Sequence, residues 1–97
     1  LYRTTVDGSV ENGYTVRLIN KSEAPRAVRI AVADAPAGIA LAHDPGIVAL
    51  APGEVRSVAL ALRAPMGTAR GRVDVRFAVS DADGTRLEEE TRFFAPP

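Results

Sequence analysis

Apolar residues occupy every second position in four stretches of the chain. In the first stretch Tyr14, Val16 and Leu18 are apolar and alternate with Thr15 and Arg17. The apolar positions of the other three stretches are Val28, Ile30 and Val32; Val58, Leu60 and Leu62; and Val73, Val75, Phe77 and Val79. A period of two is typical of β-strands with one buried face, so the pattern predicts strands rather than amphipathic helices.

Turn-forming residues separate the alternating stretches. They cluster at residues 7–8, 23–25, 34–38, 44–46, 52–53, 65–67 and 83–84. Glycine, proline and aspartate in such clusters end strands and reverse the chain. The spacing predicts an all-β fold, an immunoglobulin-like β-sandwich of seven to eight antiparallel strands, in a single domain that spans residues 1–97. We expect the tail, residues 95–97, to fray.

The last hairpin can be aligned residue by residue. A three-residue loop that ends at Gly84, in the left-handed region, places Asp81 opposite Thr85. The same register pairs Val79 with Leu87, Val73 with Phe93, Arg76 with Glu90, and Asp74 with Arg92. Glu89 then lies opposite the apolar Phe77, which is a mismatch that we interpret as a strand end or a β-bulge.

The composition excludes several classes of function. Twelve basic and twelve acidic residues give a net charge of zero, so we expect no surface that binds nucleic acid. The absence of cysteine excludes cysteine-ligated zinc, iron–sulfur clusters and thiol nucleophiles within these 97 residues. Even the longest apolar runs, such as residues 47–51, are far shorter than the ~20 residues of a spanning helix, so we expect no membrane insertion. The chain starts with Leu1 rather than methionine, and we expect a longer parent protein.

Few residues have the character of a catalytic or metal site. His43 is the single histidine and lies in a predicted turn, whereas a metal site needs several convergent ligands. The serines are Ser9, Ser22, Ser57 and Ser80, and none has the neighbouring base that a nucleophile needs. We therefore expect no catalytic residue and no metal ligand in this chain, and we predict that the domain is not an enzyme.

Two acidic segments invite a cation-binding interpretation. Asp81, Asp83 and Gly84, followed by Glu90, match part of an EF-hand calcium loop, with Gly84 and Glu90 at its glycine and glutamate positions. Val79 would occupy the first ligand position of that loop, where it cannot coordinate, so we predict a hairpin turn instead. Residues 88–90 are glutamates, and we interpret them as a solvated strand edge whose charges deter pairing with other chains.

We expect two residues in and next to the first stretch to have structural rather than functional roles. Tyr14 belongs to the inward-facing positions, and we expect its hydroxyl to find a partner near the edge of the core. Asn20 ends the stretch, and we expect it to bond backbone groups at the turn into Lys21 and Ser22.

The residues at the two ends of the chain resemble a known family. The matching residues are Asp7, Gly8, Glu11, Asn12, Tyr14, Asn20 and Lys21 near the N-terminus, and Arg92 and Phe93 near the C-terminus. In this order they resemble the C-terminal domain of the FixG/CcoG family, and the similarity extends over nearly the whole chain. We call these nine residues the signature and expect their roles to be structural.

The resemblance implies a periplasmic immunoglobulin-like domain that closes a bacterial inner-membrane protein. Members of that family resemble redox proteins with [4Fe-4S] clusters and support assembly of the cbb-type cytochrome c oxidase through copper reduction and delivery. Since this chain has no cysteine, the clusters are implied for the upstream part of the parent, and the chain itself has no cofactor. The implied role is a non-catalytic structural or interaction domain, with an oxidase subunit or a copper-delivery factor as protein partner. Its oligomeric state is left open.

Two other classes of function stay open on the residues alone. An accessory module of a secreted or surface enzyme would display aromatic residues against sugar rings, and this chain has two tyrosines, three phenylalanines and no tryptophan. A pilus-chaperone-like module would need an apolar edge strand with basic anchors. The sequence does not single out such an edge.

Overall fold

The computed structural model describes residues 2–36 and 38–97, and they form eight β-strands. The strands are β1 (Arg3–Thr4), β2 (Val10–Ile19), β3 (Arg26–Asp34), β4 (Ala40–Leu41), β5 (Ile47–Leu50), β6 (Val55–Ala64), β7 (Gly71–Asp81) and β8 (Arg86–Ala95). The four stretches with a period of two fall within β2, β3, β6 and β7. Alternation therefore located four of the five long strands, all except β8.

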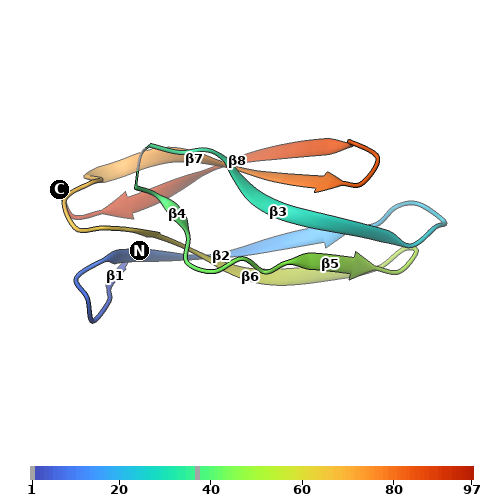
Figure 1. Ribbon diagram of the computed structural model, residues 1–97, viewed down its shortest axis with the longest axis horizontal. Coiled ribbons are helices and arrows are strands. Elements are labelled where there is room, and N and C mark those ends of the chain that lie inside the picture. The colour runs from blue at the N-terminus through green and yellow to red at the C-terminus, as the bar shows by residue number, and fades with distance from the viewer. Residues whose placement is uncertain (1, 37) are drawn as a thin grey trace.

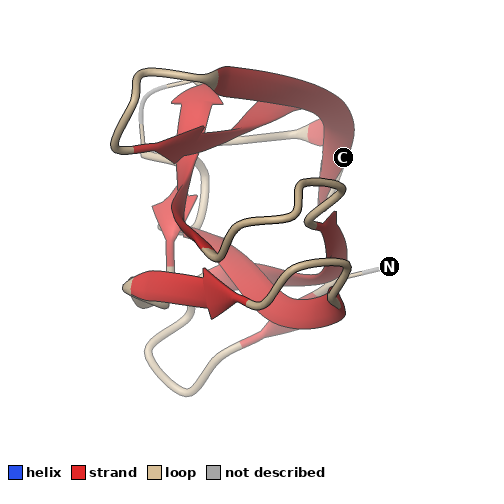
Figure 2. Ribbon diagram, turned by 90° about the vertical axis from the view of Figure 1, so that its right-hand side faces the viewer, coloured by secondary structure: helices blue, strands red, loops and turns tan. Residues whose placement is uncertain are grey.

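Two four-stranded antiparallel sheets form the two layers of the molecule (Figure 1). We call the sheet with strand order β1-β2-β6-β4 sheet A, and the sheet with order β5-β3-β7-β8 sheet B. The layers are also visible from the end of the molecule in Figure 2. The predicted all-β, immunoglobulin-like sandwich is confirmed, with eight strands.

The core lies between the sheets and is made by the inward positions of each strand. Leu62 of β6 and Phe93 of β8 have no exposed surface, and Val75 of β7 is 2% exposed. Other buried core residues are Val10, Leu18, Ile30, Ile39, Val48, Leu50, Leu60, Ala64, Phe77 and Ala95. Burial of apolar surface at roughly 25 cal/mol per Å² is the main force that holds two such layers together.

The predicted register of the last hairpin is confirmed along its length. The backbone N–H of Asp81 donates to the carbonyl oxygen of Thr85 at 3.1 Å, and Gly84 has a φ of 86°. The ladder from Ser80 to Gly71 has the predicted pairs and runs without a shift in register. The mismatch of Glu89 with Phe77 therefore occurs inside a regular ladder, and its interpretation as a bulge or strand end is wrong.

The expected fraying of the tail is also wrong for its first two residues. Ala95 pairs with Gly71 at the end of the β7–β8 ladder and is 5% exposed. The carbonyl oxygen of Pro96 accepts a hydrogen bond from the N–H of Gly71 at 3.3 Å. The small side chain of Ala95 fits the core at this end, which the sequence pattern did not reveal.

Strand β2 is only partly covered on one edge. It pairs with β6 over all ten residues, from Val10 to Ile19. On its other edge β1 pairs with Val10 and Glu11 alone. In the part of the chain that the structure describes, no other strand pairs with that edge, so the rest of it lies open.

Candidate interaction site

The two sheets are joined along one side by the side chain of Asn12. Its Nδ2 donates to the carbonyl oxygen of Phe94 at 2.8 Å, and its Oδ1 accepts from the N–H of Phe94 at 2.8 Å. The amide is 3% exposed and bonds as a residue on a neighbouring strand would. Asn12 therefore links β2 of sheet A to the edge of β8 in sheet B.

Tyr14 continues this link one inward position further along β2. Its hydroxyl donates to the carbonyl oxygen of Arg92 at 2.8 Å. Its ring meets the ring of Phe77 edge-on, with centroids 5.3 Å apart at 75°. Burial raises the pKa of Tyr14 to about 12, because the charged form would lose its hydration. We call the contacts of Asn12 and Tyr14 with Arg92 and Phe94 the β2–β8 seam.

Glu11 lies beside the seam, on the outer face of sheet A. Its Oε1 accepts hydrogen bonds from Nε (3.1 Å) and Nη2 of Arg3. Its Oε2 accepts from Nε (3.2 Å) and Nη2 (2.8 Å) of Arg63. The hydrogen bonds from Arg63 and then from Arg3 lower the pKa of Glu11. The two guanidinium groups cover the carboxylate, whose side chain is 7% exposed, and tie β1, β2 and β6 together.

Asp7 and Gly8 form the turn between β1 and β2. Oδ1 of Asp7 accepts from the N–H of Ser9 at 3.0 Å and from the hydroxyl of Thr5. The hydrogen bonds from Thr5 and then from Ser9 lower the pKa of Asp7 to about 2. Gly8 has a φ of 87°, a left-handed conformation that a side chain would disfavour. These two signature residues therefore fix the turn that returns the chain along β1.

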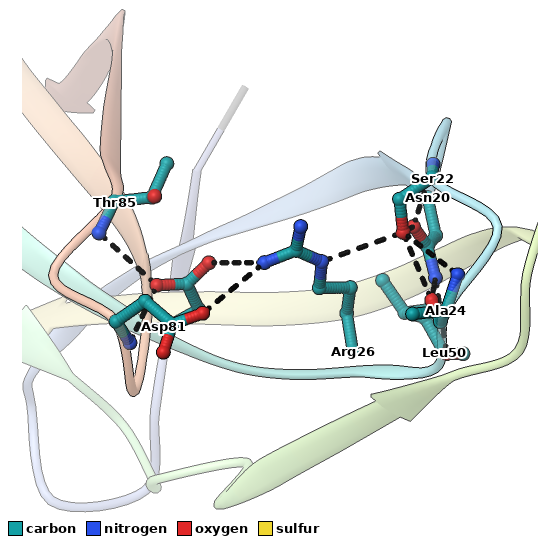
Figure 3. A network of polar contacts seen from close by, with 8 residues as sticks. Asn20, Ser22, Ala24, Arg26, Leu50, Asp81 and Thr85 are labelled. Carbon is teal, nitrogen blue, oxygen red and sulfur yellow. Dashed lines mark hydrogen bonds and ion pairs between the residues drawn. The ribbon is translucent and has the colours of Figure 1, made fainter.

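Asn20 organises the opposite end of β2 (Figure 3). Its Nδ2 donates to the carbonyl oxygens of Ala24 (2.9 Å), Leu50 (3.2 Å) and Ala51 (3.1 Å). Its Oδ1 accepts from the N–H of Ser22 at 3.0 Å and from the hydroxyl of the same residue at 2.7 Å. The side chain is 4% exposed. It bonds the turn after β2, as expected, and also the β5–β6 loop, which the sequence did not indicate.

The remaining signature residues differ in burial. Phe93 is fully buried in the core, whereas Lys21 and Arg92 are exposed. Nε of Arg92 lies 3.9 Å from Oδ1 of Asp74 across the β7–β8 ladder. Seven of the nine signature residues lie at or next to the seam or the β1–β2 turn, and Asn20 and Lys21 lie at the far end of β2.

The residues weighed for metal or catalytic chemistry lie apart. His43 is exposed in the loop between β4 and β5. Within residues 2–36 and 38–97, no three histidine, cysteine, aspartate or glutamate side chains form a group that could hold a metal ion. Residues 88–90 are exposed on β8, the edge strand of sheet B, as predicted. The described chain also contains no helix that could span a bilayer.

Asp81 caps the predicted hairpin turn. Its Oδ1 accepts from the N–H of Asp83 and of Thr85, each at 3.0 Å. Its Oδ2 lies 3.3 Å from Nη1 of Arg26, which connects the hairpin to the start of β3 (Figure 3). The carboxylate is therefore engaged in the fold on both oxygens.

Several partners in these networks were missed in the sequence. Arg3 and Arg63 hold Glu11, and Arg26 holds Asp81. Each pair joins residues on different strands, so it depends on the strand order and not on local spacing. The one available signal was Glu11 itself, a charged residue at the start of an alternating strand beside the polar Asn12.

Two shallow cavities open on the surface. One, of about 450 Å³, lies between β3 and the β3–β4 connection and is lined by Ile30, Val32, Ile39 and Leu41 among others. The other, of about 420 Å³, lies over the seam and is lined by Asn12, Gly13, Tyr14, Thr91, Arg92 and Phe94. Both are broad and open, unlike the enclosed pockets that hold small ligands.

Comparison with known proteins places these features in a family. Residues 1–96 match the sequence model described as "IG-like fold at C-terminal of FixG, putative oxidoreductase". The crystal structure of a FixG-related protein from Vibrio parahaemolyticus superposes with a TM-score of 0.80 at 23% identity, over 97% of this chain and 90% of that chain. SSP-19, an MSP-domain protein like family member in Caenorhabditis elegans, superposes with a TM-score of 0.52 at 13% identity, over 88% of each chain. The search of curated proteins gives no match.

Proposed function

The chain belongs to the family of immunoglobulin-like folds at the C-terminus of FixG, and from this membership we propose a non-catalytic interaction module. The module is part of a longer FixG-like protein that supports assembly of the cbb-type cytochrome c oxidase. The match over residues 1–96 carries this proposal. The family description refers to an oxidoreductase as a whole, and this chain corresponds to the fold at its C-terminus.

The polar residues of the chain support a binding role rather than a catalytic one. Glu11, Asn12 and Asn20 are buried, and each is bonded to groups of its own fold. A general acid or base must reach a substrate proton, and these groups have their hydrogen-bonding capacity engaged internally. The exposed surface of the strands and their edges is what remains to contact a partner.

The redox chemistry of the parent belongs to another part of the protein in this proposal. An iron–sulfur cluster is held by cysteine thiolates, and this chain has none, so its residues do not fit a cluster. The clusters are assigned to the upstream part, where electrons would reduce copper(II) before its insertion. The module is assigned to the periplasm, where it contacts an oxidase subunit or a copper-delivery factor.

Deletion of residues 1–97 from the parent tests the function. The expected result is a several-fold lower amount of assembled cbb-type oxidase in membranes, with the visible absorbance of the iron–sulfur part of the parent retained. The cluster absorbance is the control that separates loss of the module from loss of the whole protein. Normal oxidase levels after the deletion would contradict the proposal.

Copper titration tests whether the module only contacts other proteins or also binds the metal itself. His43 and Met66 are its single histidine and single methionine, and both are exposed. Copper(I) favours sulfur ligands and copper(II) favours several nitrogen ligands, so we expect no binding tighter than micromolar. Sub-micromolar binding in isothermal titration calorimetry that disappears in His43→Ala would assign the module a direct role in copper transfer.

A further inference from the structure

Strand β8 is buried at one end and uncovered at the other, on the same face. Phe93 is fully buried and Ala95 is 5% exposed, whereas Leu87 is 71% exposed. The continuous register pairs Leu87 with Val79 and Phe93 with Val73, so all four side chains lie on the inner face of sheet B. The exposure of Leu87 therefore depends on what covers the inner face of sheet B at that end of β8.

Sheet A is incomplete beyond β2. At the seam β2 faces both strands of the hairpin, because the ring of Tyr14 packs on Phe77 of β7 and its hydroxyl bonds the carbonyl oxygen of Arg92 of β8. The position beyond β2 is occupied by β1 for only two residues, Arg3–Thr4, which pair with Glu11 and Val10. No other described strand pairs with this edge of β2, so sheet A lacks a strand along residues 15–19, the part of β2 away from the seam.

The open edge of β2 has backbone groups ready for such a strand. The N–H of Thr5 donates to the carbonyl oxygen of Ser9 at 2.8 Å, so odd-numbered residues of β2 direct their backbone groups toward β1. Even-numbered residues face β6, as the bond from the N–H of Asn20 to the carbonyl oxygen of Glu54 shows. Thr15, Arg17 and Ile19 therefore present N–H and C=O groups along the open edge.

The neighbouring open edge of β8 is protected, and that of β2 is not. Residues 88–90 place three negative charges on β8, and Glu88 and Glu90 both approach Arg76 at 3.6 Å. Charged side chains on an edge strand are a common device against pairing with another chain. From Thr15 to Ile19 the edge of β2 carries one charge, Arg17, and no proline or lysine.

We propose that an extended segment of another polypeptide adds to sheet A along residues 15–19 of β2, antiparallel to it as β1 is. This β-strand addition rests on the proposed function and identifies the surface through which the module binds. The added strand would provide the ladder that β2 lacks and would cover Leu87.

The surroundings define the chemistry of the partner segment. Asn12 bonds the backbone of Phe94 and Tyr14 that of Arg92. In the proposed complex the same antiparallel spacing, continued along both strands, brings Val16 level with Glu90 and Leu18 level with Glu88. The side chain of the added segment that lies opposite Leu18 points inward, over Leu87. We therefore expect it to be apolar. The inward side chain opposite Val16 lies near the exposed Glu89 and is basic. An outward side chain beside Arg17 is acidic.

A synthetic peptide with this pattern is the probe. In acetyl-Thr-Val-Thr-Val-Glu-Lys-Thr-amide, the second valine would lie opposite Leu18, the glutamate opposite Arg17 and the lysine opposite Val16. Titration into the ¹⁵N-labelled module is expected to shift the amide signals of Thr15 and Arg17 and to slow their hydrogen exchange. The amides of Tyr14 and Val16, which face β6, serve as internal controls.

A reciprocal charge exchange tests the assigned register. Replacement of the peptide lysine by glutamate is expected to weaken binding about 2–5-fold, as for a cross-strand pair at a partly exposed site. Glu89→Lys in the module is expected to reverse the preference, so that the glutamate peptide binds better. Asp34→Lys makes the same change of charge at the end of β3, on the other side of β7 from β8, and is the matched control. Equal affinities for all four combinations at Glu89 would overturn the register.

Other occupants of the edge would give different results. If the signals of Thr15 and Arg17 shift with protein concentration alone, a second copy of the chain occupies the edge, and the proposal is wrong. If their amides are already protected in the purified full-length parent, another segment of the parent occupies it, and the proposal is wrong. Perturbation of β8 amides alone would show that the peptide prefers the acidic edge, which would also overturn the proposal.

A variant of the parent separates this inference from the proposed function. Leu87→Lys places a charge on the covered side of the added strand without disturbing the core, because Leu87 is 71% exposed. We expect it to lower the amount of assembled oxidase several-fold, as the deletion does. If the deletion lowers oxidase levels and Leu87→Lys does not, the proposed function stands and the docking edge is wrong.

Discussion

The two halves of β8 share one strand and one register but differ in what faces them. The half near the C-terminus is bonded to β2 at Phe94 and Arg92, and Phe93 there is fully buried. Among the described residues no hydrogen bond joins the half near the hairpin turn to sheet A, and Leu87 there is 71% exposed. Apolar alternation therefore tells which face of a strand points inward, but burial depends on what the other sheet places against that face.

The seam marks the boundary between the two halves. Asn12 and Tyr14 bond the backbone of β8 at Phe94 and Arg92, and the described residues make no further hydrogen bond between β2 and β8. Beyond this point both β2 and β8 have open edges. The family signature gathers mainly on the covered side of that boundary, which is consistent with structural roles for those residues.

The largest expected difference in stability is between side-chain truncations in the two halves of β8. Phe93→Ala is expected to lower the free energy of unfolding by roughly 3–5 kcal/mol, because it leaves a cavity in the packed core. Leu87→Ala is expected to change it by less than about 0.5 kcal/mol, because its side chain is already in water. Urea denaturation followed by tyrosine fluorescence measures both values. Similar losses for the two variants would show that the outer half is covered in solution.

The second effect concerns the seam. Asn12→Ala is expected to lower the free energy of unfolding by about 2–3 kcal/mol, since the N–H and C=O of Phe94 both lose their partners. Hydrogen exchange should also become faster at the amide of Phe94. Thr15→Ala, an exposed position three residues along the same strand, is the matched control and should leave both quantities unchanged. Unchanged exchange at Phe94 in Asn12→Ala would show that the seam is not a point of attachment.

The third effect appears at high pH. The pKa of Tyr14 is raised from 10.0 to about 12 in the folded protein, so the folded state holds its proton more strongly than the unfolded state. The resulting stabilisation is complete below pH 10 and is lost as the pH rises toward 12. Tyr14→Phe is expected to remove this pH dependence and, at neutral pH, to cost about 1 kcal/mol for the hydrogen bond to Arg92. If Tyr14→Phe loses as much stability above pH 10 as the unsubstituted module does, Tyr14 is not the group responsible for the pH dependence.

The smallest effect is a gain in stability where the covered half ends. Gly13 faces outward on β2, and a Cβ added to it would meet no atom within 4 Å. Gly13→Thr is expected to raise the free energy of unfolding by about 0.5–1 kcal/mol, because threonine loses less backbone freedom and favours strands. Thermal denaturation should show a higher midpoint. A lower midpoint would indicate that something approaches the backbone closely at Gly13.

Much of the fold could be predicted from local patterns. The period of two located four of the five long strands, and one left-handed glycine, Gly84, fixed the register of the last hairpin and with it β8. These features depend on neighbouring residues and turn geometry, which the sequence contains directly. The predicted pairing of Glu89 with Phe77 is present, but the bulge or strand end that we expected there is absent from the ladder.

The candidate site was less accessible from the sequence. Glu11 belongs to the outward alternation, yet it is buried because Arg3 and Arg63 reach it from two other strands. Asn12 gave no sign of its partner Phe94, which lies more than eighty residues away. Contacts of this kind follow from strand order, which alternation does not determine.

Hydrogen exchange along β2 in the isolated module is the most direct test of the incomplete sheet. We expect an alternation in which the amides of Tyr14, Val16 and Leu18, bonded to β6, exchange slowly, and those of Thr15 and Arg17 exchange at rates close to those of an unstructured peptide. Slow exchange at all five positions at low protein concentration would show that the edge of β2 is already occupied, and would contradict both the comparison of the two halves of β8 and the docking surface inferred from it.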